Sequence, residues 1–185
     1  MPGSGKSYVG SLLHRKWGMT FVDTDHLIGG REGRGLQEIL ESHGEAGFKR
    51  LEEEAILALC AINPKKAVIA TGGSAVYSEK AMNALKASSL VIHLDAPVED
   101  LKANMEKDGS PNERGILGLK GKTVDELLRE RQGLYEKYAD MTISLAGSPS
   151  EDQVMAEIMA GIQRKTGGLE MLEITPPHPR WVFRQ

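Results

Sequence analysis

The sequence has very little cysteine, no large excess of positive or negative charge, and no long apolar run. A single cysteine, Cys60, in 185 residues excludes an intrachain disulfide framework and a cysteine-rich zinc site, and it fits the reducing cytoplasm. The net charge of −3 is spread along the chain, which argues against a coat for nucleic acid or for an anionic membrane. No apolar run approaches the roughly 20 residues of a membrane span, and the first residues show no signal-peptide pattern. We therefore expect a cytoplasmic protein whose partners include neither membrane nor nucleic acid.

The composition and length predict one globular domain. Hydrophobic residues make up 40% of the chain, and the 21 glycines bring the apolar share to about half, the usual level for a folded domain. A chain of 185 residues can bury one sizeable core. We assign residues 1–165 to this domain. Residues 166–185 form a Gly- and Pro-containing tail that we expect to be partly disordered.

Short β-like runs alternate with helical stretches, which predicts an α/β fold with a mainly parallel sheet. The expected strands are 19–23, 67–71, 90–96 and 141–145. The expected helices are 6–17, a helical region within 24–62, 78–86, 98–107, 123–138 and 150–164. The segment 108–122 is rich in Gly, Pro and charge, and we interpret it as a mobile loop.

The chain opens with the segment MPGSGKS, whose last three residues match the end of the phosphate-loop pattern G-x-x-x-x-G-K-[ST]. Gly3, Ser4 and Gly5 are small enough for backbone N–H groups to curl around phosphate oxygens at a helix N-terminus. Lys6 is expected to reach the β- and γ-phosphates, and the Ser7 hydroxyl to ligate Mg²⁺. The alternative is a disordered Gly/Ser-rich start, but an amphipathic helix follows directly. This segment therefore predicts a nucleotide site.

The phosphate-loop pattern is incomplete in this sequence. Its first glycine would fall one position before Met1, and the strand that normally feeds such a loop is absent. We expect a working protein that begins roughly ten residues upstream with an apolar strand. Without that strand, two neighbouring strands would keep unpaired edges and a groove would open in the core. Alternatively, the tail supplies a replacement strand through residues 181–183 or packs into the gap.

Two polar features follow predicted strands at the end where open parallel sheets bind ligands. Asp23 and Asp25 lie two residues apart, so strand geometry would send both carboxylates to one side, one toward a metal and one toward an acceptor hydroxyl. Helix capping by Thr24 or Asp25 is the alternative. Gly72 and Gly73 either let the backbone approach a bound molecule or make a tight turn.

Four basic residues are candidates for contact with an anionic substrate: Lys49, Arg50, Arg114 and Arg131. Phosphoryl transfer needs cations on the transferred group, often delivered by a closing loop, and a carboxylate is best held by a bidentate arginine. The alternative for each is a solvated surface residue. Glu52 and Glu130 could hold these bases in place or form ordinary pairs on a helix surface.

Six segments, in matching order and spacing, resemble shikimate kinase, a small nucleoside monophosphate kinase-like P-loop protein. They are MPGSGKS, FVDTD, GEAGFKRLEEE, TGGSAV, ERGIL and ERQGLYEKYAD. The resemblance implies a P-loop kinase-type three-layer α/β/α fold with five parallel strands, the first of them missing here, and a lid over about 108–122. It implies ATP and Mg²⁺ as cosubstrate and cofactor, and phosphorylation of the 3-hydroxyl of shikimate in aromatic amino acid biosynthesis. We expect a monomer.

The same resemblance implies roles for individual residues. Its catalytic residues would be Lys6, Asp25 and Arg114, the last one from the lid. Its nucleotide contacts would be Gly3, Ser4, Gly5, Lys6, Ser7, Tyr8, Lys107 and Pro149. Its acceptor contacts would be Asp25, Lys49, Gly72, Gly73 and Arg131, and its Mg²⁺ ligands Ser7 and Asp23.

The chain departs from the family pattern at the acceptor side. Lys49 stands where the family has arginine, and Arg50 is rotated by ~100° around the helix, so it is no obvious substitute. Ser74 replaces the third glycine of the turn, and Arg-Gly-Ile-Leu replaces Arg-Pro-Leu-Leu in the lid. Two alternatives therefore stay open. One is a related kinase with another hydroxy-acid or sugar-acid acceptor, and the other is a non-catalytic nucleotide-binding paralogue.

Overall fold

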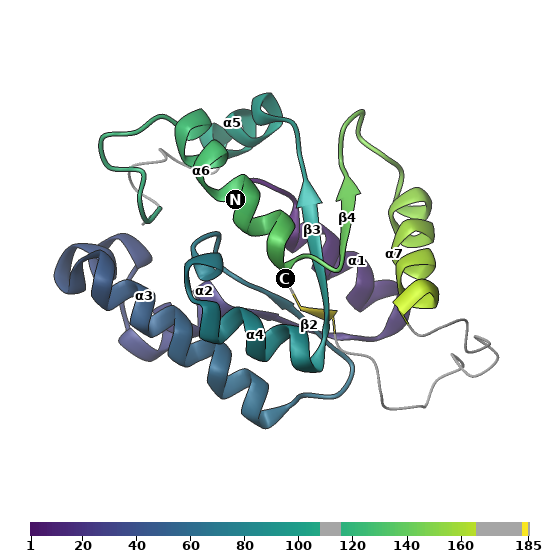
Figure 1. Cartoon of the computed structure of the whole chain (residues 1–185), viewed down its shortest axis with the longest axis horizontal. Coiled ribbons are helices and arrows are strands. Elements are labelled where there is room, and N and C mark those ends of the chain that lie inside the picture. The colour runs from purple at the N-terminus through teal and green to yellow at the C-terminus, as the bar shows by residue number, and fades with distance from the viewer. Residues whose placement is uncertain (108–115, 166–182, 185) are drawn as a thin grey trace.

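The computed structural model describes residues 1–107, 116–165 and 183–184, and Figure 1 shows how they are arranged. The elements in chain order are α1 (Lys6–Trp17), β1 (Thr20–Asp23), α2 (Thr24–Glu32), α3 (Leu36–Ile62), β2 (Ala67–Ala70), the 3-10 helix η1 (Ala75–Tyr77), α4 (Glu79–Ser88), β3 (Leu90–Asp95), α5 (Val98–Lys107), α6 (Val124–Tyr138), β4 (Met141–Ser144), α7 (Glu151–Lys165) and β5 (Phe183–Arg184). The predicted strands and helices are confirmed with small shifts at their ends. The helical region 24–62 consists of α2 and α3.

The strands form one five-stranded parallel sheet in the order β1-β2-β5-β3-β4. Side chains of β3 alternate between its two faces, as strand geometry requires. Leu90, Ile92 and Leu94 pack with α1 and α7, whereas Val91 packs with α3, α4 and α6. Figure 1 shows α4 and α6 in front of β2 and β3, with α1 behind them. The three-layer α/β/α prediction is therefore confirmed.

The tail supplies the central strand of the sheet. β5 pairs in parallel with Val68 and Ile69 of β2 on one side and with Leu90 and Val91 of β3 on the other. The prediction that these neighbouring strands keep unpaired edges is therefore wrong at these positions, and the alternative of a replacement strand from the tail describes the structure. This pairing has a physical cause, because backbone N–H and C=O groups that are buried in a core need hydrogen-bond partners. The predicted disorder of 166–182 and of residue 185 lies outside the described residues.

One end of the molecule carries a bent helix and part of the predicted lid. α3 is interrupted at Gly44, whose φ of 65° lies outside the helical region. Leu117 is buried at 2% exposure and packs with Ile28, Ile39 and Phe48 of α2 and α3. In the described part of the predicted lid, 116–122, Leu117 therefore lies against these two helices, whereas Ile116 and Leu119 pack with residues of α5 and α6. No helix within the described ranges combines the length and the apolar character needed to cross a membrane.

Candidate active site

The N-terminal loop has the backbone shape that small residues allow. Gly3 and Gly5 have φ angles of 75° and 84°, and the chain passes from Gly5 directly into α1. The Gly3 carbonyl accepts a hydrogen bond from the Asn104 side chain of α5 at 2.9 Å, which fixes the loop on that helix. Lys6 is folded back over the loop, and its Nζ donates to the Met1 carbonyl at 2.8 Å. Burial lowers the pKa of Lys6, while the carboxylate of Asp25 opposes this shift.

The other predicted nucleotide contacts lie around this loop. Ser7 and Tyr8 are exposed in the first turn of α1. Lys107 is the last residue of α5, the helix that holds Gly3. Pro149 lies in the connection between β4 and α7, and Leu145 at the start of that connection is a neighbour of Gly5. The structure therefore gathers these residues on the elements that flank the loop, although none makes a described contact with another.

The two aspartates come together through a helix start rather than along a strand. β1 ends at Asp23, and Asp25 already lies in α2, so the expectation of two side chains on one strand face is wrong. Asp23 is the helix cap, whereas the capping alternative had named Thr24 or Asp25, because its Oδ1 accepts from the Asp25 backbone N–H at 2.9 Å. Burial, and then the Asp23 carboxylate, raises the pKa of Asp25, while Lys6 lowers it. Lys6 and both carboxylates therefore share one electrostatic environment.

The glycine turn after β2 brings acidic groups and a guanidinium very close to the backbone. A Cβ atom on Gly72 would lie 2.3 Å from Oε1 of Glu52 and 2.8 Å from Oδ1 of Asp25. A Cβ atom on Gly73 would lie 3.0 Å from Nη1 of Arg131. Any side chain at position 72 would displace both carboxylates. The backbone also turns here, because the Ala75 N–H donates to the Gly72 carbonyl at 3.3 Å. Approach of these glycines to a bound molecule stays a prediction.

Glu52 is a buried acid at this turn, with 2% of its surface exposed. Its Oε2 accepts a hydrogen bond from the Ser74 hydroxyl at 2.5 Å, and its Oε1 has no partner among the described residues. Burial raises the pKa of Glu52 to about 7, although the Ser74 hydrogen bond acts in the opposite direction. The interpretations of Glu52 as a holder of Lys49 or a surface pair are therefore wrong. Its position four residues after Phe48 and before Ile56, both buried, was the sequence signal for burial.

Arg131 is 1% exposed, and its guanidinium donates to neutral groups. Nη2 donates to the Leu117 carbonyl at 2.6 Å, and Nε to the Tyr77 hydroxyl at 3.2 Å. The third described contact joins Nη1 to the sulfur of Met1 at 3.6 Å. A buried cation is costly unless a negative group compensates it. This arrangement therefore suits an anionic ligand.

Lys49 approaches the same region from α3. Its Nζ lies 4.7 Å from the centroid of the Tyr77 ring, and Cζ of Arg131 lies 5.2 Å from that centroid. Arg50 is exposed, in agreement with its rejection as a substitute for Lys49. Glu130 bonds Tyr77 and Lys122 rather than supporting Arg131 directly. Arg114 lies outside the described residues.

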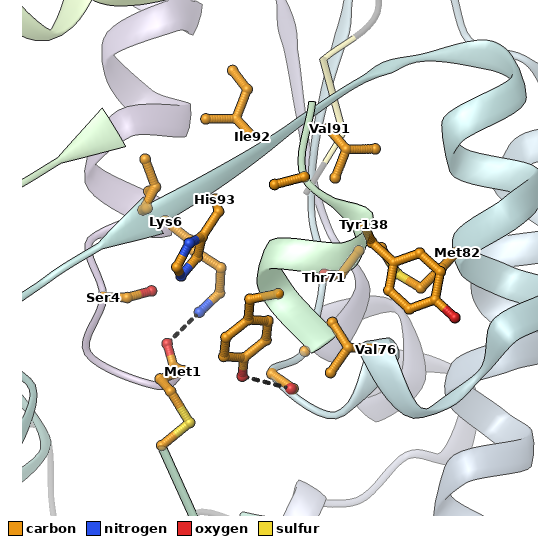
Figure 2. A pocket seen from close by; sticks show the side chains of 15 residues that line it. Met1, Ser4, Lys6, Thr71, Val76, Met82, Val91, Ile92, His93 and Tyr138 are labelled. Carbon is orange, nitrogen blue, oxygen red and sulfur yellow. Dashed lines mark hydrogen bonds between the residues drawn. The ribbon is translucent and has the colours of Figure 1, made fainter. Parts of the chain in front are cut away.

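Figure 2 shows a small cavity lined by the turn after β2 and by residues 91–94 of β3, with Lys6 and His93 directed toward it. Its volume of about 50 Å³ exceeds the roughly 10–15 Å³ that one water molecule needs, so it has room for ordered water. Tyr135 closes one side, because its hydroxyl donates to the Gly73 carbonyl at 2.8 Å and its ring stacks on His93 at 5.2 Å. Burial raises the pKa of Tyr135 to about 12, so this hydroxyl keeps its proton.

The proposed magnesium ligands offer oxygen atoms of two kinds. Ser7 provides a hydroxyl and Asp23 a carboxylate, the hard donors that Mg²⁺ takes together with phosphate oxygens and water. Within the part of the chain that the structure describes, no three His, Cys, Asp or Glu side chains gather to hold a metal by themselves. This donor set therefore fits an ion that arrives with a nucleotide.

The comparison with protein families agrees with this geometry. The family model for shikimate kinase matches residues 2–163, nearly all of the described domain. The chain belongs to the shikimate kinase family. A shikimate kinase of Paracidovorax citrulli is 36% identical over 182 residues, which cover 97% of this chain and 93% of the relative. One from Aquifex aeolicus is 34% identical over 160 residues, covering 86% of this chain and 90% of the relative.

Solved structures of the family match the fold as well. Shikimate kinase from Acinetobacter baumannii in complex with shikimate has a TM-score of 0.71 at 28% identity, covering 91% of this chain and 92% of that one. The crystal structure of the Aquifex aeolicus shikimate kinase has a TM-score of 0.69 at 33% identity, covering 89% and 94%.

Residues that depart from the family pattern, or that sequence analysis left unassigned, have specific partners in this shikimate kinase fold. Ser74, in place of a glycine, holds Glu52. Lys49, in place of an arginine, lies over Tyr77. Tyr77 and Tyr135 had no assigned role, and only the proximity of Tyr135 to Arg131 in one family-like segment gave a sequence signal.

Proposed function

We propose that this protein transfers the γ-phosphoryl group of ATP to the 3-hydroxyl group of shikimate. The observation that carries the proposal is the match to the shikimate kinase family over residues 2–163. The composition of the site supports it, because acids, a buried arginine and a glycine turn converge beside a phosphate loop. Shikimate carries hydroxyl groups at one side and a carboxylate at the other, and these need acceptors and cations respectively.

Asp25 is the residue we propose for the acceptor hydroxyl. Burial raises the pKa of its carboxyl, which makes its ionised form a better proton acceptor. Asp25 takes the proton as the hydroxyl oxygen forms its bond to the γ-phosphorus, and the bond from that phosphorus to the bridging oxygen of ADP breaks. Lys6 lies in the same electrostatic environment and places positive charge on the phosphates. Arg114 is the proposed lid cation on the transferred group.

Arg131 and Lys49 are the residues we propose for the acceptor carboxylate. The buried guanidinium of Arg131 hydrogen-bonds to neutral partners in the described structure, so an anionic ligand would stabilise it. Gly72 and Gly73 allow the ligand to lie against the backbone of the turn, next to Glu52 and Asp25.

The nucleotide and metal assignments also stay proposals. Ser7 and Asp23 would hold Mg²⁺, which when bound supplies positive charge on the phosphate oxygens. The proposed nucleotide contacts are Gly3, Ser4, Gly5, Lys6, Ser7, Tyr8, Lys107 and Pro149. We further propose a monomer that works in the cytoplasm and binds no nucleic acid, and size-exclusion chromatography tests the first point.

The experiment is phosphoryl transfer from ATP measured on a panel of acceptors, namely shikimate, gluconate and homoserine. Turnover with shikimate alone supports the proposal. Turnover with another acceptor instead would favour a related kinase. Lys49 and Ser74 are the reason for this alternative, because both residues depart from the family pattern at the acceptor side. No turnover on any acceptor, with ATP bound, would favour the non-catalytic paralogue.

A further inference from the structure

Tyr77 contacts three charged side chains that come from two helices. Lys49 Nζ lies 4.7 Å from the centroid of its ring, and Arg131 Cζ 5.2 Å. Its hydroxyl accepts from Arg131 Nε at 3.2 Å and donates to Glu130 Oε1 at 2.5 Å. Tyr77 ends η1, directly after the glycine turn that carries the proposed acceptor contacts, so this segment also carries the ring that touches both cations.

The ring lowers the electrostatic cost of bringing two cations to the same aromatic side chain. Lys49 and Arg131 repel each other, and the negative face of an aromatic ring attracts a cation within about 6 Å of its centroid. Glu130 adds negative charge at the hydroxyl. Burial and the hydrogen bond to Glu130 raise the pKa of Tyr77, so the phenol remains a proton donor. Tyr77 therefore stabilises Lys49 and Arg131 near its ring and does not neutralise either cation.

The contacts of Tyr77 also orient the N–H groups of Arg131 that it does not bind. Arg131 is held at Nε by the Tyr77 hydroxyl and at Nη2 by the Leu117 carbonyl. Its Nη1 lies next to Gly73 in the glycine turn after β2. Lysine has a flexible stem with several rotatable bonds, and contact with a ring restricts it. The ring thus gives Lys49 a defined position that a lysine in place of arginine would otherwise lack.

We propose that Tyr77 is a positioning and specificity-determining residue that arranges Lys49 and Arg131 as a joint site for the carboxylate of the acceptor. The proposal rests on the proposed function, since it needs a carboxylate-bearing acceptor. It predicts that Tyr77 acts on acceptor binding through charge, whereas a merely structural tyrosine would act on folding or on all substrates alike.

The first test compares Tyr77→Phe and Tyr77→Leu in steady-state kinetics. Phenylalanine keeps the ring and loses the hydroxyl, so we expect the KM for shikimate to rise about 5-fold, the value of one lost hydrogen bond. Leucine loses the ring as well, and we expect a rise of about 20-fold. The kcat and the KM for ATP should change less than about 2-fold, since Tyr77 does not touch the phosphate loop. Thermal melts identify any variant that fails to fold, and the phenylalanine variant then decides.

The second test uses the methyl ester of shikimate, which has no negative charge at the carboxyl group. We expect the Tyr77→Leu penalty in kcat/KM to disappear with the ester. Lys137→Ala is the matched control, because Lys137 Nζ lies 4.8 Å from the centroid of the Tyr138 ring, while its side chain is about half exposed and pairs with Glu79. It should leave both substrates unaffected.

The outcomes separate the two proposals. Equal penalties for shikimate and its ester, or a KM for shikimate unchanged in folded Tyr77 variants, would overturn the role of Tyr77 while wild-type activity stands. Absence of shikimate phosphorylation by the wild-type protein would instead overturn the proposed function. A further check is Lys49→Met, whose effect on KM should shrink in the Tyr77→Leu background if the two side chains act together.

Discussion

Replacing Glu52 by glutamine should stabilise the protein, and only at neutral and alkaline pH. Glu52 is 2% exposed, its Oε1 has no partner among the described residues, and burial raises its pKa from 4.5 to about 7. Glutamine has the same shape and keeps an oxygen that can accept the Ser74 hydrogen bond. The variant therefore removes a buried negative charge and little else.

The magnitude follows from the pKa. Each unit of pKa is worth about 1.4 kcal/mol, so ionised Glu52 lowers the free energy of unfolding by about 3 kcal/mol. Between pH 4.5 and about 7 the folded state holds a proton that the unfolded chain has lost, so stability falls as the pH rises through this window. Glu52→Gln lacks this fall. At a pH of about 8 the variant should melt about 6–12 °C higher than the wild type, and at a pH near 4 the two should coincide.

The assay is thermal or urea unfolding of both proteins across this pH range. Glu53→Gln is the matched control, since Glu53 on the same helix also accepts from a serine, Ser78, at 2.5 Å, but about a third of its side chain is exposed. The control should keep the wild-type pH dependence. A difference between Glu52→Gln and wild type that stays constant with pH, or is absent at alkaline pH, would refute the reasoning about burial.

Three further substitutions test the site. Lys6→Ala should lower kcat/KM by about 100-fold or more, because its charge acts on the phosphates, and a coupled assay of ADP release measures this. Asp25→Asn should lower kcat by at least about 100-fold without lowering the melting temperature, and near-full activity would refute its role at the acceptor hydroxyl. Lys49→Arg should lower the KM for shikimate by about 5-fold through one recovered charge-assisted hydrogen bond, and an unchanged or higher KM would mean that Lys49 does not meet the carboxylate.

The sequence by itself determined the elements and the family. Strands, helices and the loop around Lys6 depend on residues a few positions apart, and hydrophobic periodicity and glycine content report such local preferences directly. The glycines at 72 and 73 were recognised from the sequence as a special turn, but the side chains that leave no room for a Cβ atom there, Glu52, Asp25 and Arg131, are distant in the sequence. The order of six segments then predicted the family, because a shared order reflects a shared fold.

The tertiary structure decided which side chains meet. Glu52 faces Ser74 across 22 positions, Tyr77 meets Arg131 across 54, and β5 enters between two strands more than 90 positions earlier in the chain. No local pattern marks such pairs. Burial of Glu52 depends on where α3 packs against the turn after β2, and the place of β5 depends on backbone groups of β2 and β3 that it pairs with. Charge, exposure and partner are properties of the packed core, and they exist only once the distant segments are together.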